Sequence, residues 1–305
     1  MNKLLRWVCG LWILAIMTEP GLARAEKLPE AAFVSGLVGH AQTYGLSCES
    51  RSAADWAAYW GVQISEWDFL SKLPVTDNPD TGFVGSYNGL WGSIPPNSYG
   101  VHARPVAALL RQYGLQAKAR RDLTWNDLRG EIAAGRPVIV WIIGQMWSGT
   151  PIDYTASDGH TTTVARFEHT MIVTGYDQTY VYATDAYTGA SMAFYLSTFL
   201  DSWSVLGNMA ITGQGPETSR LPTPTARSAG RAKGGSYTVL PGDYLIALAD
   251  QFGTTWQELA RINAIAYPYT IFPGQVLTLP GQPVTITHQV YLPMIRRKPP
   301  RAAAP

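Results

Sequence analysis

Apolar residues recur at helical spacing in the first half of the chain. They form a broad face over residues 49–59, with Cys48 at the start of this segment and Ser47 placed to cap it. Similar patterns predict helices over residues 105–113 and 125–134. Because a helix start carries unpaired backbone N–H groups and the positive end of the dipole, we expect it to favour the thiolate form of Cys48.

The pattern changes to one typical of strands after Gly135. Three runs rich in β-branched and aromatic residues, at 137–143, 169–176 and 180–186, predict strands, and Asp177-Gln178 predicts a hairpin turn between the last two. Helices followed by strands predict an α+β domain over residues 26–213.

Two further segments follow this domain. Residues 214–236 are rich in Pro, Thr, Ser, Gly and Arg and have almost no aliphatic side chains, which predicts a flexible linker. Residues 237–280 form a second compact module, with residues 281–305 as a tail. We expect the order strand, helix, helix, strand in the module, with a turn at 241–243 and Thr254 capping the second helix. The corresponding segments are 237–240, 244–252, 255–263 and 275–279.

The N-terminus has the pattern of a secretory signal peptide. A basic start precedes an apolar run over residues 7–17, and the small-residue site Ala23-Arg24-Ala25 follows, so we expect cleavage after residue 25. The apolar run is much shorter than the ~20 residues of a membrane-spanning helix. A retained N-terminal anchor is the alternative. After cleavage Cys48 is the one remaining cysteine, which leaves a dimer bridge, an inert buried thiol or a reactive nucleophile as its roles.

Composition excludes several function classes. The net charge is +1 and the basic run at residues 296–298 is short, so we expect no nucleic-acid partner. No His or Cys pair has metal-ligand spacing and no Gly-rich phosphate loop occurs, so we expect no metal and no cofactor. We also expect a monomer.

Four residues have the chemistry of acyl transfer. Cys48 is the candidate nucleophile and His169 the candidate base. Asp185, on the neighbouring strand of the predicted hairpin, can accept from the second imidazole nitrogen and fix the tautomer. Gln42 can donate its amide N–H to the oxyanion, with the Cys48 backbone N–H as the second donor.

The other four histidines are weaker candidates for the base. His160 lies in a Gly-flanked loop and is the main rival of His169. His40 lies close before Gln42, His102 lies in a loop, and His288 lies beyond the second module.

The residues around these four positions resemble a known family. The segments that carry the resemblance are AQTYGLSCESRSAADWAAYWG and EHTMIVTGYDQTYVYATDAYTG. They are similar to papain-like cysteine peptidases related to the double-glycine leader peptidases, in which a Gln precedes the Cys by six residues. The resemblance implies a papain-like fold and the same roles for Gln42, Cys48, His169 and Asp185. Where the family often has Asn-Asp-Pro, this chain has Thr-Asp-Ala at 184–186, and no ATP-binding or membrane-spanning portion follows, so we do not expect cleavage of bacteriocin leaders.

The second module resembles a LysM domain. The resemblance rests on YTVLPGD, LARIN and GQVLTLP within residues 237–280. It implies a small βααβ fold that binds N-acetylglucosamine-containing glycans, chiefly peptidoglycan or chitin, in a shallow groove. The implied groove residues are Gly242, Asp243, Tyr244, Leu245, Tyr269, Ile271, Phe272 and Pro273.

Together these features predict a secreted, wall-associated cysteine peptidase that acts on a peptide or protein substrate. Two alternatives remain at this stage. The papain-like domain could grip a peptide without turnover, or the Cys48 thioester could pass its acyl group to an amine and join peptides.

Overall fold

The structure is a computed structural model that describes residues 27–217 and 235–280, apart from positions 241, 242, 244, 267, 268 and 273. The predicted signal peptide (1–25), the tail (281–305) and most of the predicted linker (214–236) lie outside the described residues. Within the described part, no helix combines the length and apolarity needed to cross a membrane.

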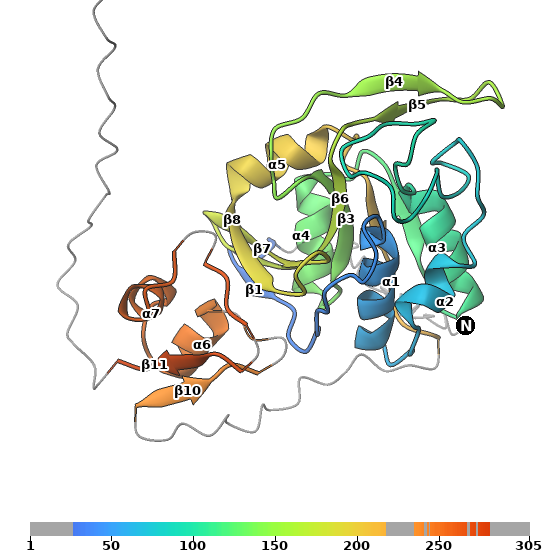
Figure 1. The fold of residues 1–305 in the computed structure, drawn as a ribbon. Helices are drawn as coiled ribbons and strands as arrows, with labels where there is room; N and C mark the ends of the chain where they lie inside the picture. Colours follow the sequence, from blue (N-terminus) through green and yellow to red (C-terminus); the bar gives the residue numbers. More distant parts are fainter. Residues whose placement is uncertain are drawn as a thin grey trace, which may run out of the picture.

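The first domain is built on a seven-stranded sheet (Figure 1). The strand order is β2-β9-β3-β6-β7-β8, and β1 also pairs with β6. All of these pairings are antiparallel. A separate hairpin, β4–β5, lies outside the sheet.

The elements of this domain have the following bounds. The strands are β1 (Ala32–Phe33), β2 (Lys118–Arg120), β3 (Val138–Ile143), β4 (Ile152–Thr155), β5 (Thr161–Val164), β6 (Glu168–Tyr176), β7 (Tyr180–Asp185), β8 (Ser191–Tyr195) and β9 (Ala210–Thr212). The helices are α1 (Cys48–Tyr59), α2 (Glu66–Leu70), α3 (Ala103–Gln112), α4 (Trp125–Ala133) and α5 (Leu196–Ser204).

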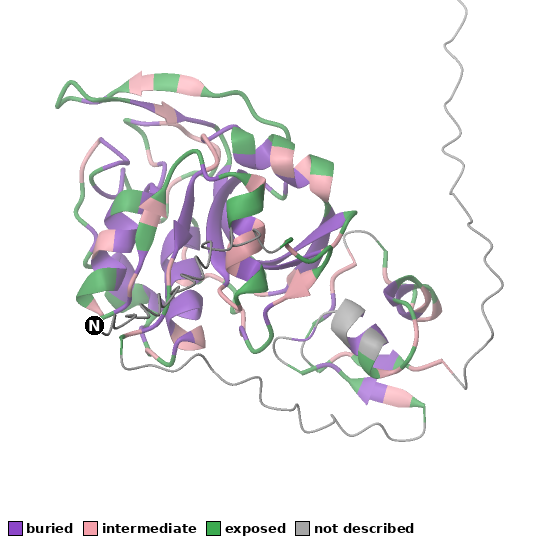
Figure 2. Ribbon diagram, turned by 180° about the vertical axis from the view of Figure 1, so that it is seen from behind, coloured by how far each residue is buried: buried purple, intermediate pink, exposed green. Residues whose placement is uncertain are grey.

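Helices cover both faces of the sheet, and this explains its apolar strands. Alternate residues of a strand point to opposite faces. Ile139, Trp141 and Ile143 of β3 pack in the core that α1, α2 and α3 share with the sheet. Val138, Val140 and Ile142 pack in a second core under α4 and α5. Figure 2 shows the central strands buried along their length.

The predicted α+β class is confirmed. The helices predicted at 49–59, 105–113 and 125–134 correspond to α1, α3 and α4, and the three predicted strands correspond to β3, β6 and β7. Met171 of β6 lies opposite Asp185 of β7, so the predicted hairpin is also confirmed. The short elements α2, α5, β1, β2, β8 and β9 and the β4–β5 hairpin were not predicted.

One predicted cap is only partly confirmed. Ser47 occupies the position before α1, but its side chain makes no capping hydrogen bond to the helix. Its hydroxyl instead donates to the carboxylate of Glu66, and Tyr44 O lies 3.1 Å from the same hydroxyl oxygen. Ser47 therefore braces the loop before Cys48.

The second module has the predicted βααβ order of a LysM domain. Its elements are β10 (Ser236–Thr238), α6 (Leu245–Gln251), α7 (Trp256–Ile262) and β11 (Val276–Thr278), and β10 pairs with β11. The predicted cap at Thr254 is wrong by one position: the side chain of Thr255 accepts from the Glu258 N–H at 3.2 Å.

The LysM module contacts the β7–β8 hairpin of the first domain. Ile271 forms an antiparallel β-bridge with Ser191 of β8. The ring of Tyr180, at the start of β7, packs edge-on against Trp256 and Tyr269 at centroid distances of 5.0 and 6.2 Å. Residues of both modules thus share one apolar cluster.

Candidate active site

Cys48 is the first residue of α1, and its thiol is buried. One turn further along α1, the hydroxyl of Ser52 lies 2.9 Å from the hydroxyl of Thr170 on β6. Thr170 follows His169 in the chain. This buried contact fixes the start of α1 beside the start of β6, and so brings the thiol to the imidazole.

His169 and Asp185 form a buried pair across the β6–β7 hairpin. His169 Nε2 lies 2.6 Å from Asp185 Oδ1. His169 precedes Met171 by two positions and Met171 lies opposite Asp185, so the two side chains emerge from the same face of the sheet. Since Nε2 is engaged by the carboxylate, Nδ1 is left for the thiol.

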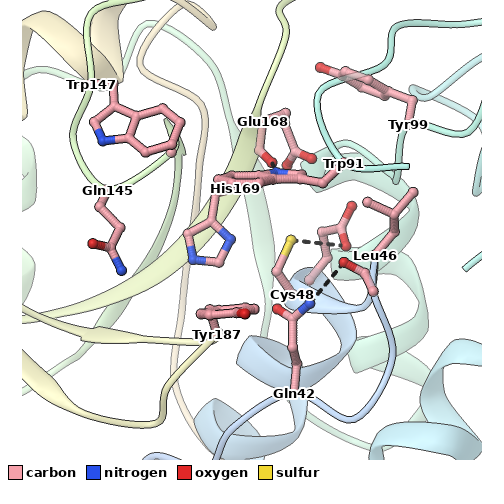
Figure 3. Close-up of a pocket in the computed structure, with 13 residues that line it drawn as sticks. Gln42, Leu46, Cys48, Trp91, Tyr99, Gln145, Trp147, Glu168, His169 and Tyr187 are labelled. Atoms are coloured by element: carbon pink, nitrogen blue, oxygen red, sulfur yellow. Dashed lines mark hydrogen bonds between the residues drawn. The ribbon is translucent and has the colours of Figure 1, made fainter. Parts of the chain in front are cut away.

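A cavity of about 380 Å³ contains the candidate residues. In Figure 3 the imidazole of His169 is turned toward the sulfur of Cys48. The lining residues are Gln42, Gly45, Leu46, Cys48, Glu49, Trp91, Tyr99, Gly144, Gln145, Trp147, Glu168, His169 and Tyr187. Three of the four predicted catalytic residues line this cavity, and Asp185 lies directly behind His169.

Asp185 is held as a carboxylate by several donors. Its oxygens also accept from the Tyr187 N–H at 3.0 Å and from the Thr188 hydroxyl at 2.8 Å. Burial alone would raise the pKa of Asp185, but the His169 contact and the two turn donors hold it below its ordinary value. A negative charge is therefore maintained next to the imidazole.

Gln42 lies in the cavity wall, but its amide is already engaged. Its Nε2 donates to the carbonyls of Tyr44 at 2.8 Å and Gly45 at 3.1 Å, while its Oε1 is buried without a partner among the described residues. An oxyanion role for Gln42 requires one of these N–H groups to turn toward the substrate.

The loop between Gln42 and Cys48 is fixed at both ends. The backbone N–H of Gln42 donates to Ala186 O at 2.8 Å, in the turn that follows Asp185. The carboxylate of Glu66 accepts from the Thr43 N–H at 2.9 Å, from the Thr43 hydroxyl and from Ser47. Glu66 therefore stabilises the loop before Cys48, a role that the sequence analysis did not predict.

The expectation that the helix start favours the thiolate is wrong. Burial raises the pKa of the Cys48 thiol, and the charges of Glu49 and Glu168 raise it further. The thiol donates to Glu49 Oε2 at 3.3 Å. Burial of the sulfur, together with the two adjacent acids, opposes the thiolate more than the dipole of α1 favours it.

Glu49 and Glu168 were also missed by sequence reasoning. One ligand atom from each of Cys48, Glu49 and Glu168 lies within 4.8 Å of the others, which makes them a group that could hold a metal ion. The signal was present in the sequence, because each acid directly adjoins a candidate catalytic residue.

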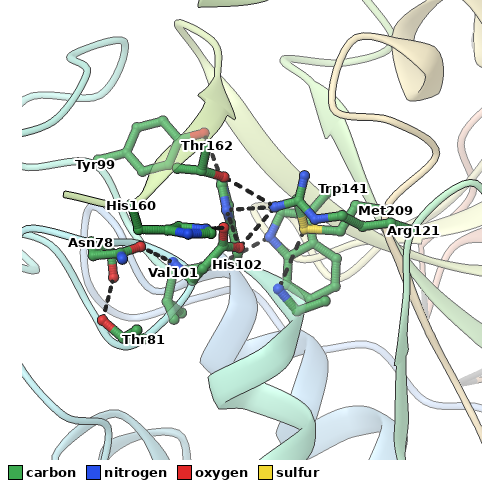
Figure 4. Close-up of polar contacts among 12 residues, drawn as sticks. Asn78, Thr81, Tyr99, Val101, His102, Arg121, Trp141, His160, Thr162 and Met209 are labelled. Carbon is green, nitrogen blue, oxygen red and sulfur yellow. Dashed lines mark hydrogen bonds and ion pairs between the residues drawn. The ribbon is translucent and has the colours of Figure 1, made fainter. Parts of the chain in front are cut away.

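Two of the other candidate histidines, His102 and His160, contact Asp80 outside the cavity. Nδ1 of His102 lies 2.9 Å and Nε2 of His160 lies 3.3 Å from the carboxylate oxygens of Asp80. Arg121 donates to the same carboxylate at 2.7 Å. Figure 4 shows the two histidines close to Arg121 and Thr162. Burial alone would raise the pKa of Asp80, but His102, Thr162 and Arg121 hold it low. This cluster ties the β4–β5 hairpin to the domain.

His40 contacts a carboxylate outside the cavity. His40 Nδ1 lies 2.8 Å from Asp55 Oδ1. His288 lies outside the described residues. Of the histidines in the described part, His169 alone lines the cavity that contains Cys48.

The predicted glycan-groove residues differ from one another in burial and in contacts. Asp243 is buried and accepts from the Tyr237 hydroxyl and the Leu240 N–H. Leu245 and Ile271 are buried, and Phe272 is half exposed. Tyr269 packs against Trp256 at 4.9 Å. Gly242, Tyr244 and Pro273 lie outside the described residues.

The fold and the arrangement of this site define a papain-like peptidase domain followed by a LysM domain. Residues 38–211 match the Peptidase_C39 like family, and residues 237–280 match the LysM domain. The chain belongs to the Peptidase_C39 like family.

Several known proteins are similar to a part of this chain. The uncharacterized protein YvpB of Bacillus subtilis is 28% identical over 184 residues, which cover 55% of this chain and 68% of that protein. A crystal structure from Bacillus anthracis, described as that of a C39-like peptidase, has 22% sequence identity and a TM-score of 0.54. The similarity covers 63% of this chain and all of that one, and it supports the fold.

A third relative matches a shorter part of the chain. The N-acetylmuramoyl-L-alanine amidase sle1 of Staphylococcus epidermidis is 33% identical over 82 residues. The match covers 27% of this chain and 24% of the amidase, so this chain spans about a quarter of that relative's length.

Proposed function

We propose that this protein is a secreted cysteine peptidase that hydrolyses peptide or amide bonds and is held at peptidoglycan by its LysM domain. The observation that carries the proposal is the buried His169–Asp185 pair, whose imidazole lines the same cavity as the Cys48 thiol. A nucleophile, a base and a residue that orients the base are the minimum set for nucleophilic acyl transfer.

The chemistry follows from these positions. His169 accepts the thiol proton as Cys48 Sγ attacks the carbonyl carbon, and the resulting oxyanion accepts from the Cys48 backbone N–H and the Gln42 amide. The imidazolium, stabilised by Asp185, then gives its proton to the leaving amine as the C–N bond breaks. Water attacks the thioester with His169 as base, which releases the acid and regenerates the thiol.

The LysM domain holds the enzyme close to its wall-bound substrate. A weak glycan site that is joined to the enzyme raises the local concentration of wall-bound substrate without a new contact in the active site. A wall substrate therefore fits the chain better than a freely diffusing protein. Export by the N-terminal segment is part of the same proposal.

The test uses purified peptidoglycan and a generic protein as parallel substrates, with new termini identified by mass spectrometry. Cys48→Ala and His169→Ala should each abolish cleavage. His160→Ala is the matched control, because His160 contacts Asp80 outside the cavity, and it should retain activity.

Three results would contradict the proposal in different ways. Cleavage by Cys48→Ala would eliminate the thiol mechanism. New amide crosslinks in place of new termini would show acyl transfer to an amine, and binding of wall peptides without either product would show a binding protein.

A further inference from the structure

Two carboxylates that line the cavity, Glu49 and Glu168, have no ion-pair partner among the described residues. The described part of the peptidase domain buries six carboxylates: Glu49, Asp55, Glu66, Asp80, Glu168 and Asp185. Four of them contact an arginine or a histidine within 4.0 Å. Glu49 and Glu168 are the two for which the described residues provide no such contact.

Their hydrogen bonding is also incomplete. Glu49 accepts from the Val101 N–H through Oε1 and from the Cys48 thiol through Oε2. No described residue donates to the Glu168 carboxylate, although its Oε1 is fully buried and only 3% of the residue is exposed. A buried carboxylate oxygen without a donor costs free energy unless a proton or a cation meets it.

The two acids adjoin each other. Alternation along β6 directs Glu168 and Thr170 toward α1. Gly100 leaves room for both groups: a Cβ built there would overlap Glu49 Oε1 and would lie 3.1 Å from Glu168 Oε2. Burial raises the pKa of Glu49 to about 7, and burial together with the Glu49 charge raises that of Glu168 well above its ordinary value.

We propose that Glu49 and Glu168 form a recognition site for a primary ammonium group of the substrate, placed within a few bonds of the scissile carbonyl. This inference rests on the proposed peptidase function and names its substrate class. An ammonium has three N–H donors, and an oxygen of each acid lies within 4.8 Å of the sulfur that attacks the carbonyl.

The walls favour an alkylammonium over a bare metal ion. Trp91, Tyr99 and Leu46 line the same cavity and present apolar surface to an alkyl stem. Aromatic faces also attract an organic cation. The acids and the thiol provide three ligands with no histidine, one short of a closed zinc site.

Occupation of this site also activates the nucleophile. The charges of Glu49 and Glu168 oppose ionisation of Cys48, and a cation bound between them offsets that effect. The thiolate is then favoured when a cationic substrate is bound, so binding and activation are coupled.

The first test does not depend on turnover. The full chain is treated with three methanethiosulfonates that differ in charge: 2-aminoethyl (cationic), methyl (neutral) and 2-sulfonatoethyl (anionic). In each case the Cys48 thiolate attacks the sulfenyl sulfur, methanesulfinate leaves and a mixed disulfide remains. Labelling of the Cys48 peptide is followed by mass spectrometry. We expect the cationic reagent to react about 10- to 100-fold faster than the neutral one, as one charged hydrogen bond gives.

Matched variants test whether the preference for the cationic reagent arises from Glu49 and Glu168. Glu168→Gln and Glu49→Gln keep the side-chain size and should each reduce the ratio of cationic to neutral rates at least about fivefold. Glu131→Gln, which changes a carboxylate on α4 outside the cavity, should leave the ratio unchanged. An equal rate for all three reagents, or a ratio that both acid variants preserve, would overturn the site. Protection of Cys48 by one equivalent of Zn²⁺ without any charge preference would overturn it in favour of a metal site.

The second test uses one peptide with a free N-terminus, its N-acetyl form, and the N-acetyl form with lysine at the cleaved residue. We expect the N-acetyl peptide to lose at least about tenfold in kcat/KM for the wild type, with no such loss for Glu168→Gln. Recovery with lysine would place the ammonium on a side chain. If no peptide is cleaved while the labelling preference persists, the proposed peptidase function fails and the ammonium site remains. Equal cleavage of all three peptides by the wild type would overturn the site and leave the peptidase function intact.

Discussion

The carboxylate of Asp185 accepts from His169 at 2.6 Å and also from the backbone N–H of Tyr187 at 3.0 Å. One side chain therefore fixes both the imidazole and the turn that carries Tyr187 into the cavity. The orientation of the base and the shape of the cavity wall depend on the same group.

Asp185→Asn should reduce kcat by about 10²–10⁴-fold with a small change in KM. The amide keeps the shape of the carboxylate but removes the charge that stabilises the imidazolium. Steady-state kinetics on a cleaved wall peptide measure this. Asp201→Asn, on the exposed side of α5, is the matched control and should behave as the wild type. An unchanged kcat in Asp185→Asn would show that Asp185 has only a structural role.

Gln42→Ala should reduce kcat by about 10²–10³-fold, the range found when one oxyanion donor is lost. Its amide also bonds the carbonyls of Tyr44 and Gly45, so a purely structural role would lower Tm instead. Measuring kcat and Tm on the same samples separates the two roles. Gln145→Ala, from the exposed part of the cavity wall, serves as the control.

Glu49→Gln should raise stability at pH 8 and change it little at pH 4. The pKa of Glu49 is raised to about 7 in the folded protein, so folding keeps a proton that the unfolded chain releases above about pH 4.5. Its contribution to stability is present below pH 4.5 and is lost as pH rises through 7. The loss is on the order of 3 kcal/mol, and the neutral amide avoids it.

Thermal unfolding of both proteins between pH 4 and pH 8 tests this prediction. The gain in Tm of Glu49→Gln should grow with pH. A gain that is constant across this range would mean that the acid does not titrate in it. Glu131→Gln again provides the comparison, since Glu131 pairs with Arg136 and is partly exposed.

Tyr180→Ala should increase retention of the protein on purified peptidoglycan by about 3- to 10-fold. Ile271 and Tyr269, two of the predicted groove residues, contact β8 and Tyr180 in the docked arrangement. Removing the ring of Tyr180 weakens docking and raises the population in which the groove is open. Sedimentation with peptidoglycan measures the bound fraction. Tyr113→Ala, at the end of α3 and remote from the docked module, is the control. Unchanged retention would place the glycan site elsewhere on the module.

The sequence predicts the parts of the site that lie on regular elements. The strand pattern of 169–176 and 180–186 placed His169 and Asp185 on one hairpin, and the helix pattern placed Cys48 at a helix start. The state of the thiol could not be predicted, because its pKa is raised first by burial and then by Glu49 and Glu168, and neither the burial nor the approach of Glu168, 120 positions later, shows in a local pattern. Local patterns carry no information on which distant charges adjoin a buried atom.

The short elements were missed for a related reason. β8 and β9 contain five and three residues, and their pairing is decided by the neighbouring strands. The contact between Ile271 and Ser191 joins two modules that the sequence treats separately. Such contacts arise from tertiary packing and leave no periodic signal.

The position of β8 at the end of the strand order has a consequence for solubility. An edge strand presents unpaired backbone N–H and C=O groups to any other extended chain, which makes it a starting point for aggregation. The bridge from Ile271 to Ser191 occupies part of that edge. The LysM domain thereby covers part of this edge, and a fragment that ends before residue 214 should leave the edge of β8 open and be more prone to self-association.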